Sequence, residues 1–248
     1  MGVQDNFKSG SDQYAQYRPS YPKAVFEYLY SLLPQHEKAW DCGTGTGQVA
    51  QELAQHFTQV FASDISASQI AHAVAADNIT YSVQAAEATD FDAAQFDLIT
   101  VGQAIHWFDF DCFYAEVRRT ARAEALLALM GYDLIQVSTS VDALIRAFYS
   151  QVLGAFWDPQ RRYIDAQYQT LPFPFKELPS PKFTHTLEWN REHLIQYLHT
   201  WSAVKHFINQ MGYNPIEKLE QELDEVWPEN IQKEVHFPIL LRIGKIHG

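Results

Sequence analysis

The stretch that decides the fold is Trp40-Asp41-Cys42-Gly43-Thr44-Gly45-Thr46-Gly47, in which an apolar segment ends in an acid and three glycines recur at every second position. Glycine has no Cβ and tolerates positive φ, so such a turn lets the backbone pass very close to a ligand. A second apolar run ends at Asp64, where a carboxylate can hold a pair of ribose hydroxyls. The order strand, glycine loop, helix, strand and acid predicts a nucleoside-binding half-fold.

The distribution of charge indicates which nucleoside is bound. No Lys or Arg lies between Lys38 and Arg118 in a chain whose formal net charge is −12. A phosphorylated cofactor normally needs a lysine, an arginine or free amides near its phosphates. Gln48 stands where a P-loop has its lysine and a dinucleotide fingerprint has its third glycine, so both motifs fail. A cationic nucleoside, S-adenosylmethionine (SAM), fits better, and Asp41 would hold its ammonium group by charge-assisted hydrogen bonding.

The same loop resembles the first motif of the class I SAM-dependent methyltransferases (methyltransferase type 11 domain), which reads Asp-x-Gly-x-Gly-x-Gly. Asp64 lies where that family has its ribose-binding acid, and residues 96–101 look like its fourth strand. Residues 101–109 and 14–22 are similar to a small-molecule branch that includes the trans-aconitate methyltransferase-like proteins. The resemblance covers roughly residues 10–135 and extends only loosely into the C-terminal half.

Alternating short apolar strands and helices predict an α/β fold with a parallel sheet covered on both faces. The resemblance implies a Rossmann-like, doubly wound, seven-stranded sheet with an α-helical C-terminal substrate cover. We expect residues 1–135 to form a SAM-binding core with an N-terminal lid, and residues 136–248 to form a substrate-cover region that completes the same sheet. Strands are expected at 38–42, 59–64, 79–83, 96–101, 124–131, 182–189 and 237–243, and helices at 23–33, 46–56, 67–75, 110–121, 142–153, 191–208 and 215–226.

Residues that follow the strands are the candidates for the cofactor site, because such sheets bind ligands beyond the carboxyl ends of their strands. Ile65 would pack against the adenine face, and the backbone carbonyl of Gln103 would face the methionine portion. Many relatives have an acid that accepts from the adenine amino group, but this chain has Ala85 there. The backbone of Ala86 or the carboxylate of Glu87 must then substitute, and Glu87 could equally be a solvated loop acid.

The N-terminal segment adds further cofactor candidates by resemblance. Tyr14, Tyr17 and Arg18 could close over the cofactor, with Arg18 or a tyrosine hydroxyl reaching its carboxylate; otherwise Arg18 is a surface charge. The predicted cofactor-binding residues are Tyr14, Tyr17, Arg18, Asp41, Gly43, Gly45, Gly47, Asp64, Ile65, Ala86, Glu87 and Gln103.

His106 and Trp107 follow the fourth strand, where the chemistry could begin. Methyl transfer is an in-line displacement, so catalysis depends largely on proximity and alignment. A neutral oxygen nucleophile needs a base, which a histidine with a pKa of about 6.5 could supply, whereas a carboxylate nucleophile needs none. His106 is therefore the catalytic candidate, and a pocket wall or a purely structural residue are the alternatives. The substrate-binding candidates are Trp107, Trp157, Arg161, Arg162 and Trp201, among which the arginines would suit a polycarboxylate.

Composition excludes several classes of protein. With a pI near 5.2 the chain lacks the basic surface of a nucleic-acid binder, and its longest apolar run is too short to span a membrane. Two cysteines provide no disulfide framework, which suggests a reducing compartment, and no secretory signal is visible. We expect a cytoplasmic monomer or homodimer with no metal site, no nucleic-acid partner and no membrane partner.

These observations predict a SAM-dependent methyltransferase (EC 2.1.1) that acts on a small-molecule acceptor and releases S-adenosylhomocysteine. The resemblance favours a carboxylate oxygen of a small organic acid as the methylated atom. A catalytically inactive SAM- or nucleoside-binding regulatory protein is the alternative. A nicotinamide oxidoreductase is opposed by the spacing of the glycines and by the absence of Lys and Arg around them.

Overall fold

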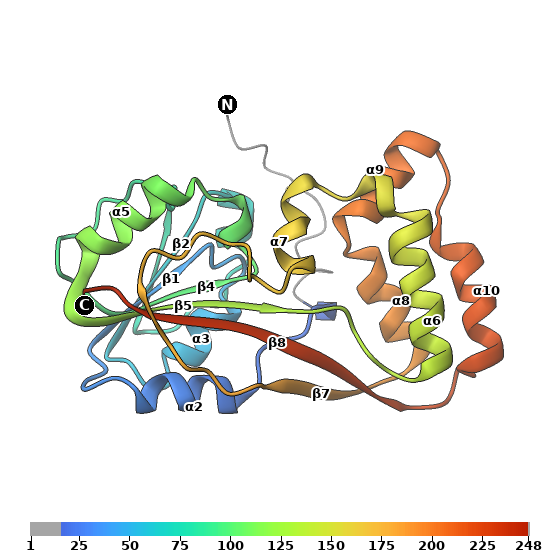
Figure 1. The fold of residues 1–248 in the computed structure, drawn as a ribbon, viewed down its shortest axis with the longest axis horizontal. Helices are drawn as coiled ribbons and strands as arrows, with labels where there is room; N and C mark the ends of the chain where they lie inside the picture. Colours follow the sequence, from blue (N-terminus) through green and yellow to red (C-terminus); the bar gives the residue numbers. More distant parts are fainter. Residues whose placement is uncertain (1–15, 248) are drawn as a thin grey trace.

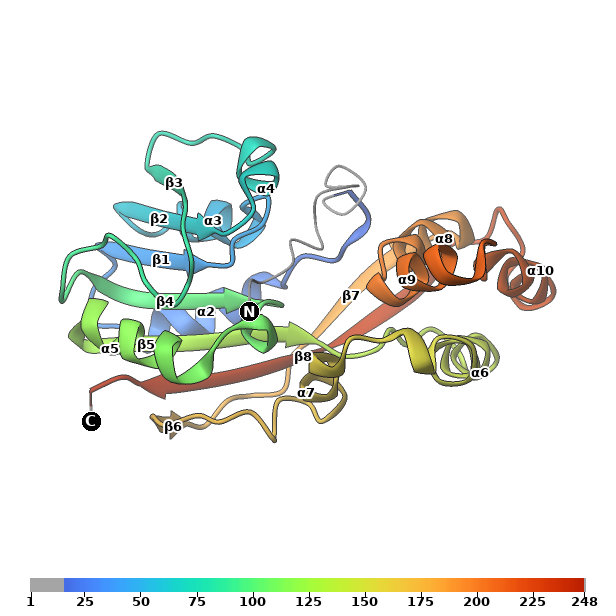
Figure 2. The same cartoon turned by 90° about the horizontal axis from the view of Figure 1, so that it is seen from above.

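A computed structural model describes residues 16–247, in which an α/β region and a helical region lie at opposite ends of long strands (Figure 1). The strands are β1 (Lys38–Cys42), β2 (Gln59–Asp64), β3 (Ile79–Val83), β4 (Phe96–Gly102), β5 (Ala121–Tyr132), β6 (Lys176–Leu178), β7 (Thr184–Trp189) and β8 (Lys233–Lys245). They form one eight-stranded sheet in the order β3-β2-β1-β4-β5-β8-β6, and β7 also pairs with β8. Figure 2 shows the strands side by side, from β3 at one edge to β6 at the other.

The predicted doubly wound α/β sheet is confirmed, and the structure adds one short strand, β6, that was not predicted. Strands β1 to β5 pair in parallel, and β8 returns antiparallel to β5. On its other edge β8 pairs first with β7 along 233–238 and then with β6 along 243–245. Since β6 and β7 pair with successive stretches of the same edge of β8, the sheet is seven strands wide, in agreement with the predicted number.

Helices cover both faces of the sheet, and the period of two along β5 shows why. Leu126, Ala128 and Met130 point into a core with the helices of one face, whereas Leu127 and Leu129 point into the core of the other face. Both faces are therefore buried, as a parallel sheet requires. The first face carries α2 (Lys23–Ser31) and α3 (Gln48–Leu53), the second carries α5 (Phe110–Thr120), and α4 (Ala67–Ala71) connects β2 to β3.

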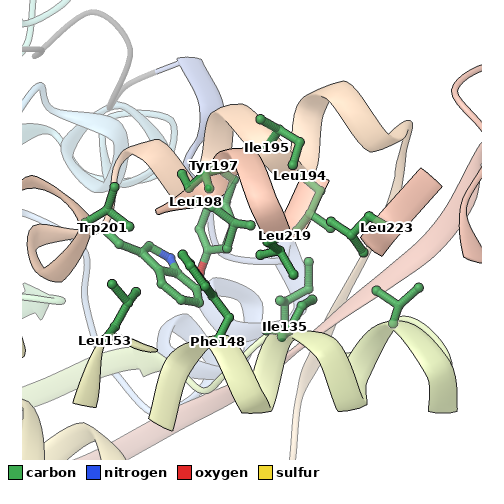
Figure 3. Close-up of a cluster of buried hydrophobic side chains, with 14 of the residues drawn as sticks. Ile135, Phe148, Leu153, Leu194, Ile195, Tyr197, Leu198, Trp201, Leu219 and Leu223 are labelled. Carbon is green, nitrogen blue, oxygen red and sulfur yellow. The ribbon is translucent and has the colours of Figure 1, made fainter. Parts of the chain in front are cut away.

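The helical region packs around a third apolar cluster (Figure 3). Its members include Phe148, Leu198 and Leu219, which come from three separate segments. The helices are α6 (Thr139–Ala147), α8 (Arg191–His199), α9 (Ser202–Met211) and α10 (Ile216–Val226), while the short α7 (Arg162–Asp165) lies between this region and the sheet.

The single helix predicted over 191–208 is wrong, because the chain forms two helices there. Trp201 is extended (φ −70°, ψ 132°) and interrupts the helical hydrogen bonds. Arg18 explains the break: its guanidinium donates to the hydroxyl of Thr200 at 2.8 Å and to the carbonyl of Thr200 at 3.2 Å. A contact with a residue far away in sequence therefore ends α8, which sequence periodicity could not reveal.

No helix within residues 16–247 has the length and apolar character needed to cross a membrane. Within the same range, no cluster of three or more His, Cys, Asp or Glu residues could hold a metal ion.

Candidate active site

The glycine loop follows β1 and turns sharply into α3. Gly43, Gly45 and Gly47 all have positive φ, at 68°, 56° and 86°. A Cβ on Gly43 would lie 2.7 Å from that of Ala104, and one on Gly47 would lie 2.3 Å from the Tyr81 hydroxyl oxygen. Backbone conformation therefore favours glycine at all three positions, and lack of space adds to this at Gly43 and Gly47.

Asp64, at the end of β2, is held against this loop. One of its carboxylate oxygens accepts from the Gly45 amide at 2.9 Å, and the other accepts from the Ser66 amide at 2.8 Å. Ser66, rather than Asp64, caps α4, because its side chain accepts from the Gln69 amide. Asp64 is thus oriented by the turn that a nucleoside would contact.

Asp41 lies beneath the loop and is only 1% exposed. Its two carboxylate oxygens accept from the hydroxyls of Thr44 and Thr100. Burial raises the pKa of Asp41 from 3.8 to about 7, although these hydroxyl donors act in the opposite direction. A cationic ligand close to this carboxyl group would stabilise its ionised form, which burial has deprived of hydrating water.

A cavity of about 80 Å³ opens between the loop and the N-terminal segment. Arg18 and Gln103 both line it and both contact Tyr132. The Arg18 guanidinium donates to the Tyr132 hydroxyl, and the Gln103 side-chain amide donates to the Tyr132 carbonyl. Gln103 has a φ of 55°, a backbone conformation that residues other than glycine seldom adopt. The cavity is lined by Arg18, Pro19, Tyr21, Asp41, Gly43, Thr44, Gly45, Thr46, Gln48, Val49, Gly102, Gln103 and Tyr132.

Two observations of the loop fit a nucleoside cofactor. The Gln69 side-chain oxygen is buried, has no hydrogen-bond partner in the described part of the chain, and lies 3.8 Å from where a Cβ of Gly45 would stand. Beside Asp64, Ile65 is 51% exposed immediately after the end of β2. An orphaned acceptor and an exposed apolar side chain are both groups that a bound nucleoside would cover.

The remaining cofactor candidates are less directly placed. Glu87 accepts from the Asp109 amide at 3.0 Å, next to the start of α5, and Ala86 is buried in the core of that face. Tyr17 lies edge-on to His193 with the ring centroids 5.2 Å apart, so it contacts α8. Tyr14 lies outside the described residues. The cofactor roles of all twelve candidates stay predictions. Tyr21 and Tyr132 line the first cavity and were missed by sequence reasoning, as was Gln69, whose buried side-chain oxygen lies near the loop.

A second cavity, of about 70 Å³, adjoins the first, because Arg18 and Gln103 line both. Four of the predicted catalytic and substrate-binding residues also meet here, two from the loop after β4 and two from the segment before α7. The lining comprises Arg18, Gln103, His106, Trp107, Trp157, Asp158, Arg161, Ile164, Thr200, Ser202 and Lys205. Three of these side chains are cationic and one is acidic, in a chain whose net charge is −12. The second cavity therefore suits an anion.

Lys205 was missed by sequence reasoning because it lies on α9, far in sequence from the glycine loop. Burial and the neighbouring charge of Arg18 both lower its pKa. Arg161 stacks over the Trp157 ring at 4.9 Å, and its Nε donates to the Tyr149 hydroxyl at 2.9 Å. The cations Arg18 and Lys205 thus repel each other, and an anion bound between them would relieve that repulsion.

His106 is 7% exposed, and its Nδ1 has no hydrogen-bond partner among residues 16–247. Burial, and to a smaller extent the charge of Arg161, lowers the pKa of His106 from 6.5 to about 3. The imidazole is therefore neutral and only weakly basic at neutral pH. This fits a hydrogen-bonding pocket wall better than a general base.

Two predicted substrate residues do not line the second cavity. Trp201 is 3% exposed and lies behind Trp157, with the ring centroids 5.4 Å apart. Arg162 lies over the Tyr163 ring and lines a third cavity further out. The structure thus brings His106, Trp107, Trp157 and Arg161 together and leaves Trp201 as a supporting residue.

Comparison with known proteins agrees with this geometry. A family model described as "Methyltransferase domain" matches residues 40–129, from β1 into β5. The structure of a candidate type II methyltransferase from Anaeromyxobacter dehalogenans is 38% identical, with a TM-score of 0.87 over 93% of this chain and 98% of that one. A candidate methyltransferase of Dictyostelium discoideum is 29% identical over 253 residues, which cover 97% of this chain and 95% of that protein. The chain belongs to the class I methyltransferase family.

Proposed function

We propose that the protein is a SAM-dependent methyltransferase that methylates a carboxylate oxygen of a small organic acid. The observation that carries the proposal is the pair of adjoining cavities. One lies against the glycine loop and Asp41, and the other is lined by Arg18, Arg161 and Lys205. A cation site and an anion site that share Arg18 and Gln103 suit a positively charged methyl donor and a negatively charged acceptor.

The residues around the loop fit SAM. Asp41 would receive the ammonium group, Asp64 would receive the ribose hydroxyls, and Ile65 would cover one face of the adenine. The loop carries no Lys or Arg that would favour phosphates. When bound, SAM supplies a methyl group on a sulfonium, and its transfer to a carboxylate gives a neutral methyl ester and neutral S-adenosylhomocysteine without releasing a proton.

The protein's own contribution would be alignment and exclusion of water. Arg161 and Lys205 would hold the carboxylate, and the neutral ring of His106 would fix its orientation. Because a carboxylate needs no general base, the low pKa of His106 is compatible with this reaction. The narrower likeness to the trans-aconitate branch stays a prediction, and nothing in the site favours the inactive regulatory alternative.

The cofactor is tested first by calorimetric titration with S-adenosylhomocysteine, with NADH run in parallel. We expect micromolar binding of S-adenosylhomocysteine alone. Asp64→Ala should weaken it strongly, whereas the matched control Asp92→Ala, at an exposed loop acid, should not. Binding of NADH alone, or normal affinity in Asp64→Ala, would contradict the proposed cofactor site.

The acceptor is tested by screening small carboxylic acids for formation of S-adenosylhomocysteine. Arg161→Gln and Lys205→Met should raise the acceptor KM by roughly tenfold each, as expected for loss of one charged hydrogen bond. Their affinity for S-adenosylhomocysteine should stay unchanged. Lys218→Met serves as the control, because Lys218 is an exposed lysine of α10. Turnover only on neutral acceptors would refute the anion site.

A further inference from the structure

A third cavity lies outside the second and is the largest of the three, at about 270 Å³. It meets the second cavity at His106 and Trp107, which line both. Its other lining residues come from the entry to α5 and its first residue, and from residues 159–163, which run into the first turn of α7. They are Phe108, Phe110, Pro159, Gln160, Arg162 and Tyr163.

We propose that this outer cavity binds an aromatic ring of the acceptor, so that the substrate is an aryl-substituted carboxylic acid and not a compact polyacid. The inference rests on the proposed function, because it assumes that the carboxylate occupies the second cavity. It makes Phe110 and Tyr163 specificity-determining residues for the ring.

The volumes of the two cavities indicate which part of the acceptor, the carboxylate or the ring, each can hold. A cavity of about 150 Å³ is known to accommodate benzene inside a protein. The second cavity, at about 70 Å³, is half that size and can hold a carboxyl group with little more. The outer cavity, at about 270 Å³, exceeds that size and can hold a ring. An acceptor that filled both would place its carboxylate next to the cofactor and its ring toward the outside.

The outer cavity has a largely polar lining, to which a pair of aromatic side chains in mutual contact contributes. Phe110 and Tyr163 already meet edge to face at 5.4 Å, the arrangement that aromatic rings prefer, and a further ring could extend it. Arg162 lies 4.9 Å from the Tyr163 ring and is the only charged side chain among the residues found to line this cavity within the described chain. By contrast, the second cavity has three cations and one acid.

The junction between the cavities contains a polar group that lacks a partner. Nδ1 of His106 is buried and makes no hydrogen bond within the described residues, and the ring lies 5.1 Å from that of Trp107. A polar atom of an acceptor that spans the junction would satisfy this nitrogen, whereas a ligand confined to either cavity alone need not.

The test is calorimetric titration of the protein saturated with S-adenosylhomocysteine, so that binding is measured without turnover. The probes are propionate, 3-phenylpropionate and propane-1,2,3-tricarboxylate. We expect 3-phenylpropionate to bind at least about tenfold more tightly than propionate, because burial of a phenyl ring adds apolar contact. Tyr163→Ala should remove most of that preference and leave propionate binding unchanged.

A second variant covers the case in which Tyr163→Ala fails to fold. Gln160→Trp places a bulky ring at an exposed position of the cavity wall and should abolish the preference by filling the space. Tyr213→Ala is the matched control, since Tyr213 is 57% exposed and lines none of the three cavities.

The outcomes separate this inference from the proposed function. Failure to bind S-adenosylhomocysteine overturns both. Normal binding of S-adenosylhomocysteine, with the tricarboxylate as the tightest probe, overturns only the aryl-acid inference. A phenyl preference that persists in both Tyr163→Ala and Gln160→Trp also overturns it, because the ring would then lie elsewhere.

Discussion

Replacing Asp41 by Asn should change how the stability of the protein depends on pH. Burial raises the pKa of Asp41 from 3.8 to about 7, so the folded protein keeps a proton that the unfolded chain has already lost. Between about pH 4 and pH 7 the folded state therefore binds more protons than the unfolded state, and stability falls as pH rises. Asn at this position is neutral throughout and removes that dependence.

The size of the effect follows from the two pKa values. A gap from 3.8 to about 7 corresponds to ~4 kcal/mol, at about 1.4 kcal/mol per pKa unit. This stabilisation is fully present below pH 3.8 and is lost as pH rises through 7. The difference in unfolding free energy between Asp41→Asn and the wild type should therefore shift by ~4 kcal/mol in favour of the variant as pH rises from about 4 to 8. This corresponds to roughly 10 °C in melting temperature.

The assay is thermal and urea unfolding of both proteins at matched pH values, in which the titration of all other groups cancels in the difference. A difference that stays constant between about pH 4 and pH 8 would refute the raised pKa.

The same carboxyl should control ligand binding if it receives the ammonium group. About a tenth of Asp41 is ionised at pH 6 and about nine-tenths at pH 8, so the affinity for S-adenosylhomocysteine should rise by about tenfold across this range. Asp41→Asn should bind more weakly and show no such rise, which calorimetric titration at the two pH values would measure.

Three further predictions concern other residues. Gly43→Ala should cost ~2 kcal/mol in urea unfolding and abolish S-adenosylhomocysteine binding, since φ is 68° and its Cβ would lie 2.7 Å from a side chain in the loop after β4. Gly154→Ala, which meets nothing within 4 Å, should change neither. Arg122→Met should cost ~2–3 kcal/mol at neutral pH by leaving buried Asp97 without its cation. That loss should shrink below about pH 4. The Lys38 amide, the Gln35 side chain and Arg122 lower the pKa of Asp97 against the effect of burial, and their stabilisation disappears when the carboxyl is protonated. The rate profile of the wild type should show no ionisation of His106 between about pH 5 and pH 8, and a His106→Gln profile of different shape would contradict its low pKa.

The sequence by itself determined the α/β sheet and the ligand-binding turn, because both depend on local patterns. Short apolar runs alternating with helices specify a buried parallel sheet wherever the rest of the chain goes. Gly43 and Gly47 have positive φ, and Asp64 ends the next strand, so the position of the loop beside that acid could be predicted from the sequence. The helical boundaries were less accurate, since distant contacts decide where a helix ends.

Only the tertiary structure decided the acceptor side of the site. Lys205 of α9 lines the same cavity as Gln103, although α9 belongs to the helical region and Gln103 follows β4 of the sheet. Arg18 ends α8 at Thr200, a contact between residues 182 positions apart. The pKa values of Asp41 and His106 likewise depend on which atoms surround them. Local patterning carries no information about such long-range neighbours, so the charge and shape of the acceptor cavities emerge only when the chain is folded.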